Sequence, residues 1–225
     1  MDCKRFQRRA ERDEKMTGKF ITFEGPEGGG KSTHIKLLAD FLRSKGKEVL
    51  VTREPGGTRL AELIRSLVRE ELEDPPVTQS EVLLFLAARA QVVSNVIRPA
   101  LEKGVWVLCD RFSDSTFAYQ GYGRGVEVDL LRRLNDFATQ GLVPDMTVLL
   151  DVPPEVSRSR LLARQADTKS TADRIEQAGE DFHRRLREGF LAMAKDEPQR
   201  FTVVDSSKEL EDVSKNIEEA VLKLL

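Results

Sequence analysis

The chain has 225 residues, 40% of them hydrophobic, which is enough for one full α/β core and too little for two comfortable domains. Its 36 basic and 38 acidic residues give a formal charge of -2, whereas a nucleic-acid-coating surface would show a basic excess. The two cysteines, Cys3 and Cys109, show no metal-ligand spacing, and no apolar run approaches the length of a membrane span. We therefore expect a cytoplasmic protein with neither nucleic acid nor a membrane as partner.

Residues 1–15 are polar and charged and contain no apolar stretch, so they do not form a secretory signal. Their acidic residues also speak against a transit peptide. We interpret this segment as a disordered extension, although Met16 lies just before the first predicted strand and could be the true start. Residues 16–225 read as a single domain, because no linker, repeat or low-complexity stretch interrupts them.

Strand and helix patterns alternate along this domain. Short apolar, β-branched runs predict buried strands at 19–24, 48–52, 105–109, 146–150 and 201–204. Apolar residues at helical spacing predict helices at 32–45, 58–72, 79–103 (interrupted near Pro99), 114–120, 128–139, 154–164, 175–194 and 209–224. The polar stretch 165–172 separates two of these helices. Such alternation predicts a five-stranded parallel sheet with helices on both faces.

A phosphate-binding motif connects the first strand to the first helix. The motif G-x-x-x-x-G-K-[ST] is matched in full, followed by Thr33, and its residues are Gly25, Pro26, Glu27, Gly28, Gly29, Gly30, Lys31 and Ser32. Glycines let backbone N–H groups surround an anion, and the following helix adds a favourable dipole. Lys31 can then reach the β- and γ-phosphates of ATP, and the Ser32 hydroxyl can bind Mg²⁺. We therefore predict the fold of P-loop NTPases.

The motif alone does not identify the acceptor of the phosphoryl group. A GTPase or motor ATPase uses water, but the chain has neither Asn-Lys-x-Asp nor an Asp-x-x-Gly after a strand. A small-molecule kinase needs a second anion site. Arg53 and Arg111 follow the second and third predicted strands, beside the phosphate loop, where guanidinium groups can grip a phosphate. Asp110, at the same strand end, can orient Mg²⁺ or its waters.

From residue 16 onward the chain resembles bacterial thymidylate kinases over essentially its whole length. The markers are FEGPEGGGKST, TREPGGT, EVLLFLAARAQ, DRFSDSTFAYQG, PDMTVLLDV and DRIEQ. The resemblance implies transfer of the γ-phosphoryl of ATP to dTMP with Mg²⁺, and it implies a homodimer. A different nucleotide or nucleoside kinase, or a P-loop regulatory protein with little turnover, stays open as an alternative.

Carried over by position, the resemblance assigns the dTMP phosphate to Arg53 and Arg111. It places Phe85 on the thymine ring, with Arg89, one helical turn later, at the carbonyl edge of the base. Glu27 lies near the sugar. The nucleoside pocket is completed by Ser115, Thr116, Tyr119 and Gln120.

The catalytic arginine is expected in a lid near residues 164–177. Some members of the family carry it in the phosphate loop after the acidic residue, but that position here is Gly28. A basic segment that includes Arg158 and Arg160 can supply it instead. Arg164 is the first choice and Arg174 the second, while a solvated basic helix face is the plain alternative.

Overall fold

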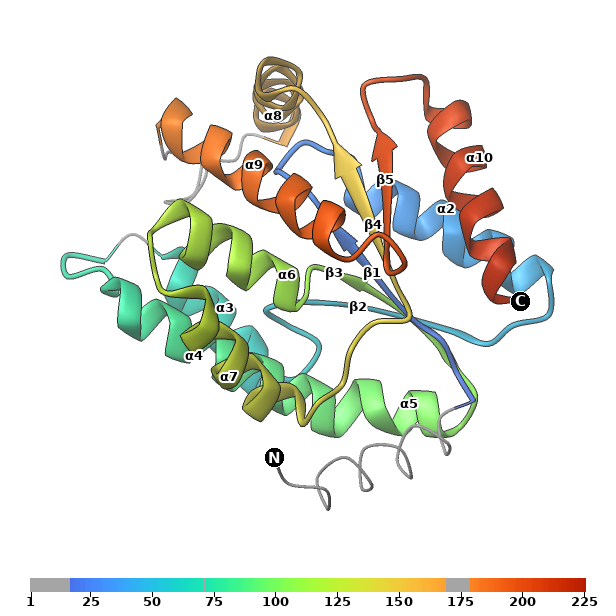
Figure 1. Ribbon diagram of the computed structural model, residues 1–225, viewed down its shortest axis with the longest axis horizontal. Coiled ribbons are helices and arrows are strands. Elements are labelled where there is room, and N and C mark those ends of the chain that lie inside the picture. The colour runs from blue at the N-terminus through green and yellow to red at the C-terminus, as the bar shows by residue number, and fades with distance from the viewer. Residues whose placement is uncertain (1–16, 71, 169–178) are drawn as a thin grey trace.

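The computed structural model describes residues 17–70, 72–168 and 179–225. Within them, five strands form one parallel sheet in the order β2-β3-β1-β4-β5 (Figure 1). The strands are β1 (Phe20–Glu24), β2 (Val49–Arg53), β3 (Trp106–Asp110), β4 (Met146–Asp151) and β5 (Phe201–Asp205). The predicted fold class is confirmed, and every strand lies where the sequence places it to within one residue at each end.

The register of the sheet brings the carboxyl ends of the central strands level with one another. β1 is buried along its whole length and pairs with β3 on one side and β4 on the other. Phe23 and Arg53 both pair with Asp110, from opposite sides. The loops that follow β1, β2 and β3 therefore begin at one edge, where ligands of parallel sheets bind.

Helices cover both faces of the sheet, as expected from strands whose side chains alternate between faces. Ile21 and Phe23 pack against α2 (Lys31–Ser44) and α10 (Leu210–Val221), while Phe20 packs on the opposite face. The opposite face carries α4 (Thr78–Val92), α5 (Arg98–Glu102), α6 (Ser113–Thr116) and α9 (Glu180–Asp196) (Figure 1). The remaining helices are α3 (Arg59–Arg69), α7 (Val128–Thr139), α8 (Pro154–Thr168) and the 3-10 turn η3 (Leu222–Leu224).

Two helices contain π-helical turns that the sequence pattern does not reveal. The predicted interruption near Pro99 is the segment η1 (Val93–Ile97), which joins α4 to α5. The short helix predicted at 114–120 begins at Ser113 and continues as η2 (Phe117–Gly123). Such turns are frequent at functional sites, and η2 carries two of the predicted nucleoside-pocket residues.

The continuous helical stretch Thr78–Glu102 is long and apolar enough to cross a membrane by length and composition, with a mean hydropathy of 1.4. The expectation that no apolar stretch reaches that length is therefore wrong. This stretch is a core helix of the domain, because it packs on the sheet and contacts both α3 and α7.

The helix before the predicted lid is longer than expected. α8 continues through Thr168, although the sequence predicts its end at Arg164 and a polar stretch at 165–172. The good helix formers that follow Arg164, Gln165 and Ala166, explain the extension. The rest of the predicted lid and residues 1–15 lie outside the described residues.

Candidate active site

The phosphate loop has the backbone that its glycines predict. Gly25 has φ +127° and Gly28 φ +73°. A Cβ at Gly25 would lie 2.4 Å from the carbonyl oxygen of Leu150, and one at Gly28 would lie 2.5 Å from that of Ser157. Neither position has room for a side chain. The loop leads directly into α2, so the N-terminus of this helix faces the space that the loop surrounds.

The Lys31 ammonium lies across the loop. It donates hydrogen bonds to the carbonyl oxygens of Gly25, at 3.1 Å, and Pro26, at 2.8 Å. Burial lowers the pKa of Lys31, and the charge of Arg111 lowers it further. An anion in the loop would relieve both effects, because a phosphate offers a charged acceptor to an amine that now has only neutral carbonyls.

Ser32 and Asp110 meet at the mouth of the loop, as the sequence predicts. The Ser32 hydroxyl donates to Oδ2 of Asp110 at 3.2 Å. Oδ1 of Asp110 is buried and has no hydrogen-bond partner among the described residues. A hydroxyl and a carboxylate with a spare oxygen suit Mg²⁺, which binds through few protein oxygens and keeps waters and phosphates as its other ligands.

Arg111 emerges from the end of β3 in a left-handed backbone conformation, with φ +71°. Its guanidinium donates to Glu27 Oε1 at 2.7 Å, and to the carbonyl of Gly25 and the hydroxyl of Ser115, each at 3.1 Å. It also lies 4.9 Å from the centre of the Tyr119 ring. Burial lowers the pKa of Arg111, but Tyr119 and the neighbouring carboxylates together hold it well above its usual value. Arg111 is therefore a fixed cation directly beside the phosphate loop.

Arg53, the other predicted phosphate ligand, is more exposed than Arg111 and is held by fewer contacts. It emerges from the end of β2, is exposed, and pairs with Glu62 of α3 at 3.0 Å. The same carboxylate accepts the backbone N–H of Gly57 at 3.0 Å. An exposed pair of this kind holds its partners only weakly, so the guanidinium of Arg53 can exchange Glu62 for a phosphate at low cost.

One cavity of about 590 Å³ joins these groups. The phosphate loop forms one side of it, and α3, α4 and the segment after β3 form the others. Predicted residues that line it are Glu27, Gly28, Gly30, Lys31, Ser32, Thr33, Arg53, Phe85, Arg89, Asp110, Arg111, Ser115, Thr116, Tyr119 and Gln120. Gly25, Pro26 and Gly29 belong to the loop but do not line the cavity.

Phe85 and Arg89 both line the cavity but differ in burial and in how firmly their side chains are held by neighbours. Phe85 is half-buried and packs beside α3. Arg89 is buried, and its donors are engaged by Glu54 Oε2 at 2.7 Å, the Thr116 hydroxyl at 2.8 Å, the Phe112 carbonyl at 3.0 Å and Asn135. Four of its five N–H groups are thereby used, which leaves at most one for a ligand.

The remaining nucleoside-pocket residues are held from behind by buried polar contacts. Gln120 donates to Glu81 Oε1 at 2.9 Å, and Glu81 also pairs with Arg124 at 3.1 Å. One of the two N–H donors of the Gln120 amide is thereby used, so its carbonyl oxygen and its second N–H can serve a ligand. Tyr119 is buried, and burial raises its pKa, so its hydroxyl stays protonated.

Comparison with known proteins identifies the family of the chain. A family model described as thymidylate kinase matches residues 23–217. The chain belongs to the thymidylate kinase family. A thymidylate kinase from Pseudomonas fluorescens is 49% identical over 93% of this chain and 98% of its own length. One from Carboxydothermus hydrogenoformans is 51% identical over 88% of this chain and 94% of its own length.

A solved structure supports the same family. The crystal structure of thymidylate kinase from Ehrlichia chaffeensis matches with a TM-score of 0.73 and 34% sequence identity. The match covers 91% of this chain and 98% of that one.

In this member of the thymidylate kinase family, several residues of the cavity were not assigned from the sequence. Glu54, Pro55, Arg65, Val68 and Arg69 also line it. Arg65 and Arg69 are four residues apart on α3 and therefore share one face of this helix. With Arg53 placed at the cavity, this spacing is the sequence signal that could have predicted that both arginines line it. Glu54 carries a buried oxygen, Oε1, with no hydrogen-bond partner among the described residues. Burial raises its pKa to about 6.

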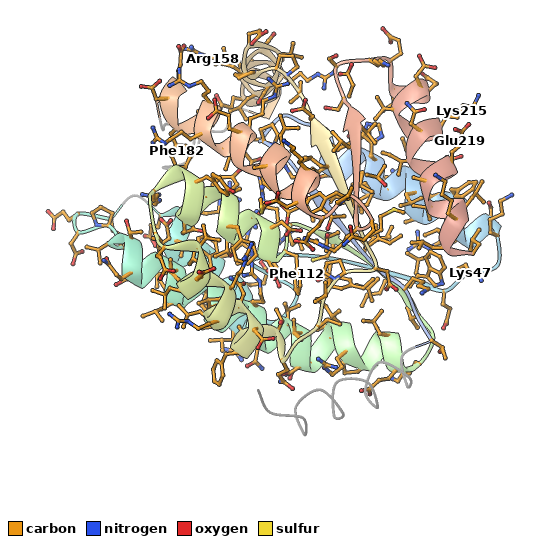
Figure 2. The ribbon with its side chains drawn as sticks, viewed as in Figure 1. Lys47, Phe112, Arg158, Phe182, Lys215 and Glu219 are labelled. Atoms are coloured by element: carbon orange, nitrogen blue, oxygen red, sulfur yellow. The ribbon has the colours of Figure 1, made fainter. Side chains whose placement is uncertain are left out.

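The arginines of the predicted lid are placed only in part. Arg158 lies at the outer side of α8 (Figure 2) and pairs with Glu180 at 3.0 Å. Arg160 lines the cavity and donates to the Ser206 carbonyl at 2.8 Å. Arg164 falls within α8, but its side chain, like the whole of Arg174, lies outside the described residues.

Glu24, at the end of β1, is fully buried behind Arg111. Burial, together with the charge of Asp114, raises its pKa to about 7, although Arg111 acts in the opposite direction. The folded protein therefore keeps a proton on Glu24 between about pH 4.5 and about pH 7, where the unfolded chain loses it. This contribution to stability is full at low pH and is lost as the pH rises through about 7.

We predict that Glu24→Gln flattens this dependence. The free energy of unfolding of the wild type, minus that of the variant, should fall by roughly 1–3 kcal/mol between pH 5 and pH 8. Urea unfolding at four pH values measures it, and every other titrating group cancels in the difference. Parallel curves for the two proteins would show that Glu24 titrates normally.

Proposed function

We propose that this chain transfers the γ-phosphoryl group of ATP to dTMP, giving dTDP and ADP for dTTP synthesis. The observation that carries the proposal is the single cavity shared by Lys31 of the phosphate loop and Arg111 at the end of β3. Two polyanions can bind there side by side. The names of the relatives support the same reaction, since the chain covers almost their full length.

The reaction needs no general base. The attacking atom is a phosphate oxygen of dTMP, which is already anionic at neutral pH. The protein has to bring two anions together and neutralise the charge that spreads over the transferred group, so positioning and electrostatics supply the rate. Arg111 and Arg53 hold the acceptor phosphate, while Lys31 and the loop N–H groups hold the β- and γ-phosphates of ATP.

Ser32 and Asp110 would hold Mg²⁺, directly or through water. The spare buried oxygen of Asp110 supports this assignment. Bound there, the ion would neutralise phosphate charge during transfer. The protein side of the site already brings the hydroxyl and the carboxylate together at 3.2 Å.

For the nucleoside we propose that Phe85 stacks on the thymine. The free N–H of Arg89 serves a carbonyl of the base, with Ser115, Thr116, Tyr119 and Gln120 around it. Glu27 serves the sugar. Its carboxylate lies next to Arg111 at 2.7 Å, which offsets its repulsion of the phosphates.

We further infer that residues 16–225 act as one kinase domain whose lid, near 164–177, closes over ATP and excludes water. A lid arginine, with Arg164 as first choice, then stabilises the transferred group. Gly28 in the phosphate loop, where other members carry arginine, supports a lid source. We propose a cytoplasmic location, which the free, buried thiol of Cys109 supports.

The acceptor decides the function. We expect ADP release from ATP and Mg²⁺ to depend on dTMP and to be much slower with dCMP, AMP or GMP, and dUMP is offered as a further acceptor. A coupled assay with each acceptor offered separately measures this. Turnover that prefers another nucleotide, or none above background, would retain the phosphate-loop assignment and discard the roles given to Phe85 and Arg89.

Two arginine substitutions should separate acceptor binding from transfer. Arg111→Ala removes a fixed, buried cation and should raise the KM for dTMP by about 100-fold, the cost of losing a charge-assisted contact. Arg164→Ala should chiefly lower kcat and leave that KM within a few-fold. Steady-state kinetics with dTMP varied distinguishes the two, and a normal KM in Arg111→Ala would contradict the acceptor assignment.

We also propose a homodimer that forms through α3, α4 and α7. These helices lie side by side at one end of the molecule (Figure 1). They expose large apolar side chains, with Phe137 83% exposed, together with Leu60, Leu63, Leu67, Leu83 and Leu130. A second copy of the chain would cover them, because an apolar surface of this extent is typical of interfaces.

Sedimentation velocity tests the dimer. We expect the mass of two chains for the wild type and of one chain for Leu63→Glu or Phe137→Glu. Leu210→Glu, on the exposed side of α10 across the sheet, is the matched control and should stay dimeric. A monomeric wild type would contradict the proposal.

A further inference from the structure

Glu24 is the last residue of β1 and has no role in the reaction described above. Both of its carboxylate oxygens are nevertheless committed to the segment that follows β3. Oε1 accepts the backbone N–H of Phe112 at 2.8 Å and that of Ser115 at 3.2 Å. Oε2 accepts the Ser115 hydroxyl at 2.6 Å. One buried side chain therefore binds three donors of a four-residue stretch.

This stretch is the one that aims Arg111. Phe112, whose N–H is bound by Glu24, lies in the interior between the sheet and the helices (Figure 2). Ser115 links Glu24 to Arg111, because the same hydroxyl that donates to Glu24 accepts a hydrogen bond from the Arg111 guanidinium at 3.1 Å. A series of two side-chain hydrogen bonds, Glu24–Ser115–Arg111, therefore connects the central strand to the arginine proposed to bind the acceptor phosphate.

The backbone of Arg111 needs such support. A left-handed conformation in a residue other than glycine costs on the order of 1–3 kcal/mol and persists only where its surroundings fix it. The N–H of Arg111 is fixed by the carbonyl of Phe23 at 3.0 Å, within the sheet. The next donor along the chain, the N–H of Phe112, is fixed by Glu24. The strand and the carboxylate together clamp both sides of the left-handed residue.

We infer that Glu24 is a positioning residue for the acceptor phosphate, which acts by holding the turn after β3 so that Arg111 faces the phosphate loop. This inference rests on the function proposed above. Titratable groups around Glu24 are Asp114, Arg111, Lys31, Tyr119 and the Cys109 thiol. Asp114 is itself neutralised by Arg200 at 2.7 Å. Reach, rather than charge, is what the two backbone hydrogen bonds to Oε1 require.

Two substitutions separate reach from charge. In an assay at pH 8, above the pKa of Glu24, Glu24→Asp keeps the charge but is one methylene too short. It should raise the KM for dTMP about tenfold, the effect of losing one or two hydrogen bonds to a charged group. Glu24→Gln keeps the reach, and its amide oxygen can still accept both N–H groups. It should change this KM by less than about threefold. In both variants kcat and the KM for ATP should stay near wild type.

The decisive experiment is a double-mutant cycle with Arg111→Lys, which keeps the cation but cannot make the same contacts. If Glu24 acts through Arg111, Glu24→Asp should raise the KM for dTMP by less than about twofold in the Arg111→Lys background. Equal effects in both backgrounds would overturn the inference. So would a larger effect of Glu24→Gln than of Glu24→Asp, or a parallel loss of ATP affinity.

Two controls complete the test. Asp145→Asn alters a carboxylate that accepts the N–H of Phe20 at 2.8 Å, at the opposite end of β1, and should leave the KM for dTMP unchanged. Thermal unfolding of each variant checks that it is folded. A wild type that does not turn over dTMP would refute the proposed function itself, whereas normal turnover with a failed cycle would refute only the role of Glu24.

Discussion

The site depends on one constraint, the level register of β1, β2 and β3. Because Arg53 and Phe23 pair with the same residue, Asp110, the three loops that carry the charged groups start within one or two strand spacings of each other. The charged side chains of the three loops can therefore lie close together even though each loop is short. A slip of one residue in any of these strands would turn its side chains to the other face and separate Arg111 from the phosphate loop.

Three arginines at or behind the site are already paired with carboxylates. Arg111 has Glu27, Arg89 has Glu54, and Arg200 behind the site has Asp114. In the two more buried pairs, Arg89–Glu54 and Arg200–Asp114, neither partner could stay charged without the other, since an unpaired buried charge is strongly destabilising. Pairing also fixes each guanidinium before a substrate arrives. Little reorganisation is then needed on binding, which is how a preformed polar site favours a charged transition state.

Much of this arrangement could be predicted from the sequence, and the limits have physical causes. The strands were found because buried parallel strands are continuous apolar runs, and the phosphate loop because its glycines have no substitute. The resemblance supplied the role of Phe85, whose apolar surroundings in the sequence would by themselves place it in the core, and that of Arg89.

Other features depend on contacts between distant residues. The engagement of Arg89 by Glu54 and Asn135 joins three separate segments of the chain. The three hydrogen bonds of Glu24 cross from one strand to the loop of another. The sequence underestimates the length of α8, because the polar stretch after Arg164 begins with Gln165 and Ala166, which are good helix formers.

The anchoring of α8 and α9 has a mechanical consequence. The Ser157 hydroxyl donates to the carbonyl of Glu27 at 2.5 Å, so the first turn of α8 is tied to the phosphate loop. On α9, Arg187 grips Asp151 at the end of β4 through two hydrogen bonds of 2.7 and 2.8 Å. Both contacts lie at the carboxyl-terminal edge of the sheet, but only α8 is bonded to the phosphate loop itself, while α9 is bonded to the end of the neighbouring strand. A displacement of the first turn of α8 would therefore be transmitted directly to the backbone of the phosphate loop.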